Sequence, residues 1–313
     1  MTTAKIYTTI PQQLTILRAR GMTLDETEAS AWLEHVGYYR LSGYWYPYRL
    51  PSSQPRERLD QFMPGTNFHD IALLYEFDRK LRGRIFDGIE RLEVALRAQI
   101  AAHVAALSPL AYRDQSTFRT AFAFQQWLDT VDSRVERAQA RNDAIRHWYS
   151  HHEVPPPLWV VLEVLDFSDI SIMYSGLPTA TQWDIADNLG LRIDLTALSK
   201  TQRAAALKRH PLTRWLQQVT IARNACAHHA RLWNQHFLPV STAALRTNTQ
   251  LSGLPTRASK QLYGIIELIT AVLAIVSPGS TWRNKTDQLI TNTFAQIPGR
   301  SLSEIGYPET TPN

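Results

Sequence analysis

Apolar side chains recur every three or four residues along much of the chain, which is the spacing of one face of an α-helix. The strongest run persists for about eight helical turns. Its apolar positions are Ile71, Leu74, Phe77, Leu81, Ile85, Ile89, Leu92, Leu96 and Ile100. Thr66 or Asn67 precedes the run as a candidate N-cap, and Asp70 stands in its first turn, where a carboxylate complements the helix dipole. We therefore expect one long helix here.

Further helices follow from the same periodicity and from the proline, glycine and capping residues at their ends. They are expected at residues 11–20, 24–36, 118–150, 158–174, 181–189, 195–209, 211–230, 259–276 and 287–296. Thr23 is the candidate cap of the second of these. The aromatic segment 37–49 is expected to be irregular and to pack as a small core, residues 51–58 to form a surface loop, and the tail from Gly299 to be frayed. No stretch alternates as a strand does, so the sequence predicts an all-α fold.

The chain divides by these patterns into three regions: an N-terminal helical and aromatic segment (1–65), a helical bundle (66–240) and a C-terminal helical extension (241–313). No run of 18 uncharged apolar residues exists, which argues against a membrane span. The N-terminus lacks the hydrophobic core of a signal peptide, so a cytoplasmic location is expected. The single cysteine argues against a disulfide scaffold and against a cysteine-based zinc site.

The charge of the chain is +5, and 27 of its 33 basic residues are arginine. A guanidinium pairs with phosphate through two hydrogen bonds and stacks on bases. Together with nine Trp and twelve Tyr, this composition is compatible with nucleic-acid binding. Arginine-rich, solvated helix faces explain the same composition.

Arg223, Asn224 and His228 form the pattern with the clearest chemistry. On a helix, Asn224 and His228 share a face, and Arg223 lies about 140° from His228 but has a side chain long enough to reach the same cleft. Imidazole transfers protons near neutral pH, arginine stabilises phosphate charge in a transition state, and asparagine can orient the imidazole. Because the RNA 2′-hydroxyl is itself a nucleophile, the three residues suit RNA cleavage. A polar helix end, or histidines held by hydrogen bonds, would produce the same spacing.

Five segments of the chain resemble the AbiD/AbiF-like abortive-infection proteins, which are bacterial phage-defence proteins with a HEPN domain. They are residues 37–47, 68–82, 89–97, 158–163 and 223–234, and the resemblance extends from about residue 10 to residue 234. It implies a HEPN-type bundle of four to five helices in which Arg223, Asn224 and His228 cut RNA with no metal and no cofactor. HEPN nucleases place two motifs face to face, so the resemblance also implies a homodimer. It further implies a small structured RNA as a partner.

Four residues are candidates for a supporting role at this site. Glu163 lies in an apolar segment, where a buried carboxylate would need a partner: it would orient Arg223 or His228, or pair structurally with another arginine. His229, Arg231 and Asn234 fall within the motif segment. They would either contact RNA or hold the end of the helix.

A second arginine–histidine pair, Arg97 and His103, lies on the long helix, but it lacks the asparagine and follows the regular amphipathic pattern, which favours a structural role. The further RNA-binding candidates are Tyr39, Arg40, Arg79 and Arg82. The histidines at 147, 151 and 152 have only Glu153 near them in sequence, so no metal site is expected. Three functions stay open: a ribonuclease of phage defence, a non-catalytic RNA-binding module, and a scaffold for a defence complex.

Overall fold

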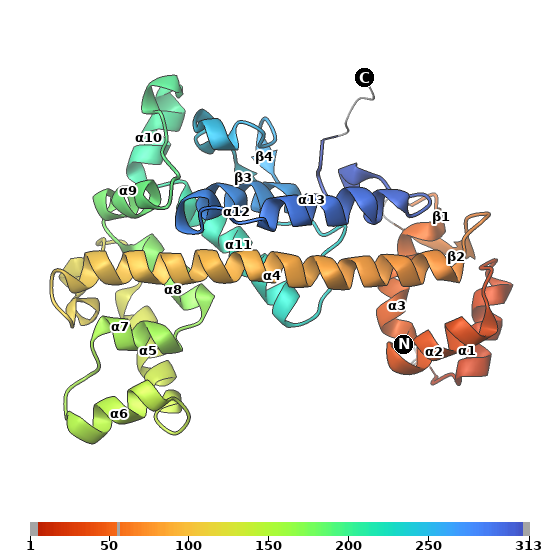
Figure 1. The fold of residues 1–313 in the computed structure, drawn as a ribbon, viewed down its shortest axis with the longest axis horizontal. Coiled ribbons are helices and arrows are strands. Elements are labelled where there is room, and N and C mark those ends of the chain that lie inside the picture. The colour runs from red at the N-terminus through yellow and green to blue at the C-terminus, as the bar shows by residue number, and fades with distance from the viewer. Residues whose placement is uncertain (1–5, 55–56, 309–313) are drawn as a thin grey trace. The chain divides into compact units, whose positions relative to one another are not determined.

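The chain is mostly helical in a computed structural model, which describes residues 6–54 and 57–308 (Figure 1). Within these residues there are thirteen α-helices and two antiparallel pairs of short strands. The predicted all-α class is therefore confirmed. Residues 1–5, 55–56 and 309–313, which belong to the predicted N-terminal segment, surface loop and tail, lie outside the described residues.

Contacts within the chain divide it into two compact units. Of the described residues, unit 1 comprises 6–54, 57–82 and 286–304, and unit 2 comprises 83–285 and 305–308. Helices α4 (Phe68–Ala105) and α13 (Trp282–Asn292) contribute residues to both units. The three regions expected from the sequence stay a prediction, because a division by contacts does not show which segments fold independently.

Unit 1 contains α1 (Ile10–Ala19), α2 (Glu26–His35), α3 (Tyr38–Trp45), a hairpin of β1 (Arg49–Pro51) and β2 (Arg58–Phe62), and the beginning of α4. The side chain of Asp25 caps α2. Thr23 was the wrong choice of cap, because its hydroxyl donates to the carbonyl of Thr66 instead. Asn67 caps α4, accepting a backbone hydrogen bond of 2.9 Å.

The aromatic segment 37–49 is not irregular but folds mainly as helix α3. Gly37 has a φ of +90°, and this conformation, which glycine adopts freely, separates α3 from α2. Tyr44 and Trp45 then fall on the buried face, and the Tyr44 hydroxyl donates to Asp78 on α4 at 2.7 Å. The expected packing role of the segment is confirmed, and within the predicted loop 51–58 the two end residues belong to the strands of the hairpin, Pro51 to β1 and Arg58 to β2.

Helix α4 is the long helix that the periodicity predicts. All nine of the apolar positions named above are at most 1% exposed. An apolar stripe of this length packs against several other elements along the helix. Such tertiary packing, rather than intrinsic helix propensity, stabilises most helices in proteins.

Unit 2 contains α5 (Phe124–Ala138), α6 (Asp143–His151), α7 (Leu158–Val161), α8 (Phe167–Gly176), α9 (Thr179–Asn188), α10 (Lys200–Lys208), α11 (Leu212–Ala227), β3 (Val240–Ser241), β4 (Ala258–Ser259) and α12 (Leu262–Val276). Two predicted helices are each split. Asn142 caps α6 and so divides residues 118–150, and the pair Asp166 and Asp169 forms a capping box that starts α8 within residues 158–174. These caps outweigh the apolar periodicity that runs across them.

The tail is ordered through residue 308, contrary to expectation. Ile305 is buried, and the ring of Tyr307 lies 4.8 Å from the ring of Tyr263 on α12. Helix α11 packs against both α8 and α12. Among residues 6–54 and 57–308, no helix combines the length and the apolar character that crossing a bilayer demands.

Candidate functional site

The C-terminal end of α11 carries the Arg223–His228 motif. The helix ends at Ala227, earlier than expected, because the chain turns in a Schellman arrangement. The amide of His229 donates to the carbonyl of Cys226 at 3.1 Å, and the amide of Ala230 donates to the carbonyl of Ala225 at 2.8 Å. His229 supplies the left-handed residue of this turn, with a φ of +55°.

Asn224 and His228 lie one helical turn apart at this end of α11. The amide of His228 donates to the carbonyl of Asn224 at 2.9 Å, and both side chains are exposed. The predicted shared face is therefore present, and its imidazole and carboxamide groups are open to solvent.

Arg223 points toward helix α4. Its side chain is half-buried, and the guanidinium carbon lies 5.8 Å from the centre of the Phe86 ring. Burial raises the pKa of Glu93, and the positive charges of Arg97 and Arg223 oppose that rise. Within the described residues, the buried Nε of Arg223 has no hydrogen-bond partner. In the part of the chain that the structure describes, this guanidinium therefore lies near the Phe86 ring and keeps its Nε donor unused, and its charge acts on Glu93 without an ion pair between the two.

Glu93 is the residue that the sequence interpretation missed. It is only 9% exposed and accepts a hydrogen bond of 2.6 Å from Arg97, which also donates to the carbonyl of Leu165 at 2.8 Å. The signal was its position four residues before Arg97, the spacing at which a Glu and an Arg on one helix pair. The structure therefore gathers Arg97, Glu93 and Arg223 into one charged cluster.

The second arginine–histidine pair is not brought together. The Nδ1 atom of His103 lies 2.8 Å from the carbonyl of Gln99 on its own helix, whereas Arg97 is occupied by Glu93. Residues six apart on a helix lie about 120° apart around the axis. The observed positions favour the structural interpretation of this pair.

Arg223 and His228 are close in sequence but are not in direct contact. They are separated by about 7.5 Å along the helix axis. In the described part of the chain, no side-chain hydrogen bond or ion pair joins them. One copy of the motif therefore presents a guanidinium and an imidazole at the same helix end without a hydrogen bond or ion pair between them among the described residues.

The four supporting candidates have different surroundings. Glu163 is exposed, so the expectation that it needs a buried partner does not apply. The guanidinium of Arg231 lies 5.5 Å from the ring centre of Trp233. Asn234 has a φ of +53° and, like the exposed His229, shapes the backbone after α11. Contact of these residues with RNA stays a prediction.

The four further RNA-binding candidates all belong to unit 1. Tyr39, Arg40 and Arg79 are exposed. Arg82 is 5% exposed and forms an ion pair with Asp78. This guanidinium is part of the interior of unit 1, so the structure removes Arg82 from the set of surface cations.

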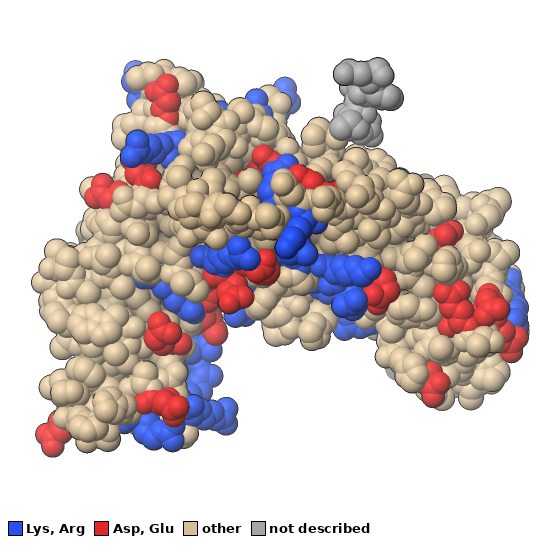
Figure 2. Space-filling view, in the orientation of Figure 1, with Lys and Arg blue, Asp and Glu red and all other residues tan. Residues whose placement is uncertain are grey.

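Basic and acidic side chains lie beside one another in the middle of the face shown in Figure 2. Ion pairs such as that between Arg91 and Asp87 at 3.0 Å account for such neighbours. A positive total charge is therefore partly neutralised locally. No group of three His, Cys, Asp or Glu side chains within the described residues is arranged to hold a metal ion.

Comparison with known proteins identifies the family. The model of the Abi-like protein family matches residues 31–234, which include the α11 motif and Glu93. The match covers well over half of the chain, so the chain belongs to the Abi-like protein family. The resemblance to AbiD/AbiF proteins is thereby confirmed, and membership implies abortive-infection phage defence. No curated protein and no solved structure matches the chain.

Proposed function

We propose that this protein is a metal-independent endoribonuclease of the HEPN type that acts in abortive infection. The observation that carries the proposal is the helix end itself. Asn224 and His228 are exposed one turn apart, and Arg223 at the same end lies near the ring of Phe86. Family membership supports the biological setting.

The proposed reaction is attack by a ribose 2′-hydroxyl on the adjacent phosphorus. The imidazole of His228 takes the proton of the 2′-hydroxyl as the new O2′–P bond forms. The P–O5′ bond breaks, and the leaving O5′ receives a proton from a general acid. Arg223 stabilises the additional negative charge on the phosphate oxygens. The products are a 2′,3′-cyclic phosphate and a 5′-hydroxyl.

A second copy of the chain supplies what one copy lacks. After it accepts the proton of the 2′-hydroxyl, the imidazole of His228 is in the protonated form that a general acid needs. It faces the attacking O2′, however, and not the leaving O5′. His228 of a homodimer's other subunit can act as the acid from the opposite side. The separation of Arg223 from His228 in one copy, with no side-chain hydrogen bond between them in the described residues, fits this arrangement. Dimer formation, or a bound regulatory RNA, would then control the activity.

The test is RNA cleavage by purified full-length protein in the presence of EDTA. We expect cleavage to fall at least 100-fold in Arg223→Ala and in His228→Ala, the size typical of losing an acid–base or charge-stabilising group. His236→Ala removes an exposed histidine outside the motif and should cleave normally. The cyclic phosphate end should be found on the products. Cleavage that persists in both motif variants would disprove the assignment.

A non-catalytic RNA-binding module is the second candidate. The observation that favours it is the separation of Arg223 from His228, since separate groups can still bind phosphates. It predicts RNA affinity that falls with salt, no products, and little effect of His228→Ala. End-group analysis of RNA after incubation distinguishes the two functions.

A further inference from the structure

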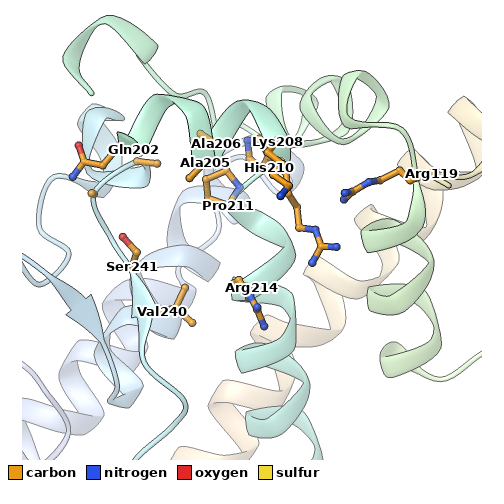
Figure 3. A pocket seen from close by; sticks show the side chains of 13 residues that line it. Arg119, Gln202, Ala205, Ala206, Lys208, His210, Pro211, Arg214, Val240 and Ser241 are labelled. Atoms are coloured by element: carbon orange, nitrogen blue, oxygen red, sulfur yellow. The ribbon is translucent and has the colours of Figure 1, made fainter. Parts of the chain in front are cut away.

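A basic pocket of about 540 Å³ lies at the opposite end of α11 from the motif (Figure 3). Three segments line it: Arg119 from the segment before α5, residues 202–214 from α10 to the start of α11, and residues 240–244 from β3 onward. All of these segments belong to unit 2. The volume is within the range of pockets that bind small organic ligands.

Positive charge gathers in this pocket without a counterion. Its lining includes Arg119, Lys208, Arg209 and Arg214, and none of the described lining residues is acidic. The pKa of Arg209 is lowered by burial and then by the charges of Arg119 and Arg214, so these three guanidinium groups repel one another. Nη1 of Arg119 is buried and has no hydrogen-bond partner among the described residues. Bringing like charges together costs free energy that a bound anion would recover.

A buried neutral histidine adds a further donor. His210 lines the pocket and is fully buried. Its Nδ1 accepts a hydrogen bond of 3.1 Å from the amide of Leu212, so the proton of the neutral ring is on Nε2. This Nε2 has no partner within the described part of the chain. Buried donors are nearly always satisfied in proteins, and this one belongs to a ring that lines the pocket and also packs edge-on against Trp183, with 4.7 Å between the ring centres.

Apart from Gln202 and Ser241, the rest of the lining is apolar. Ala205, Ala206, Pro211, Val240 and Ala244 contribute to it. Ala206 and Ala244 belong to a hydrophobic cluster that includes Leu198. An inorganic anion would leave this surface uncovered, whereas a molecule with both a phosphate and a flat apolar body would cover it.

We propose that this pocket binds a nucleotide, with the phosphate between Arg119, Arg209 and Arg214 and the base over the alanine-lined surface. The nucleotide is either a free mononucleotide or the 5′-phosphorylated terminal nucleotide of an RNA. The pocket lies about 24 Å from the motif, the length of the 16-residue helix α11. The inference stands on the pocket's own residues and does not require the proposed ribonuclease activity.

The test is isothermal titration calorimetry of the full-length protein with four probes: adenosine monophosphate, inorganic phosphate, a 5′-phosphorylated RNA oligonucleotide and its 5′-hydroxyl counterpart. The Arg223→Ala background prevents cleavage of the oligonucleotides. Adenosine monophosphate should bind, and Arg209→Ala and Arg119→Ala should each weaken it about tenfold or more, the size of one charged hydrogen bond. Arg203→Ala, which removes an exposed arginine of the same segment outside the pocket, should bind normally.

A second variant separates the base from the phosphate. Ala205 is an exposed residue of the pocket, and Ala205→Phe should fill its apolar part while preserving every charge. We expect this variant to lose adenosine monophosphate. Tighter binding of the 5′-phosphorylated than of the 5′-hydroxyl oligonucleotide identifies an RNA end as the occupant, and equal binding of the two identifies a free nucleotide. Absence of adenosine monophosphate binding, or binding unchanged by Arg209→Ala and Ala205→Phe, overturns the proposal even if RNA cleavage is normal.

Discussion

Two glycines of α4 provide a matched test of how closely this helix is packed in unit 2. A methyl group added at Gly88 would lie 2.6 Å from Cε2 of Trp282 and 2.8 Å from Cγ2 of Ile269. The same change at Gly83 meets nothing within 4 Å. The two substitutions by alanine therefore share one backbone effect and differ only in the space around the new methyl group.

The magnitudes follow from these contacts. Alanine in place of glycine in a helix interior stabilises by about 1 kcal/mol, which is the whole effect expected at Gly83. At Gly88 the methyl group must displace Trp282, which is 2% exposed and donates from Nε1 to the carbonyl of Arg84 at 2.7 Å. Overpacking of this kind costs about 1–3 kcal/mol. We expect Gly88→Ala to be less stable than Gly83→Ala by that amount.

The measurement is urea unfolding of both variants and the wild type, followed by circular dichroism. Gly83→Ala should unfold at higher urea than the wild type, and Gly88→Ala at lower urea than Gly83→Ala. Because Phe86 and Glu93 lie on the same stretch of α4, Gly88→Ala should also reduce RNA cleavage, and Gly83→Ala should not. Equal stabilisation by both substitutions would refute the close approach of Trp282 and Ile269 to α4.

Two further predictions concern pH. Burial raises the folded pKa of Glu93 above 4.5, so the ionised form is the costly one in the folded state. The wild type should therefore gain stability relative to Glu93→Gln as the pH falls from 7 through that raised pKa. Glu93→Gln should also cleave RNA about tenfold more slowly, because the negative charge of Glu93 no longer acts on Arg223. Parallel stability–pH curves for the two proteins would contradict this. Burial lowers the pKa of His210 to about 4, so the unfolded chain binds the additional proton between pH 6.5 and 4. The free energy of unfolding should therefore fall by up to about 3 kcal/mol as the pH is lowered over that range. His210→Gln should remove this fall, which is measured by urea unfolding at pH 7 and pH 5. An unchanged fall in the variant would show that another group is its source.

The sequence by itself determined the helical class, the long helix α4 and its buried face, and the family. The helices follow from periodicity, which depends only on residue type and spacing. The family follows from sequence segments that are compared directly, without knowledge of the fold. The helix boundaries were less well predicted. At Asn142 and Asp166 a helix cap competes with an apolar periodicity that would continue the helix. Which of the two signals prevails depends on tertiary packing, and the sequence pattern does not show that packing.

Only the tertiary structure decided which groups meet. Glu93 and Arg223 are 130 positions apart, and no spacing rule connects residues of α4 and α11. Arg82, a surface cation by sequence, is buried because Asp78 on the same face pairs with it. The basic pocket likewise joins Arg119 to the turn between α10 and α11 and to β3. The sequence shows which residues are charged. Whether a charge is neutralised by an opposite charge or lies beside like charges depends on neighbours that only folding brings within a few ångströms.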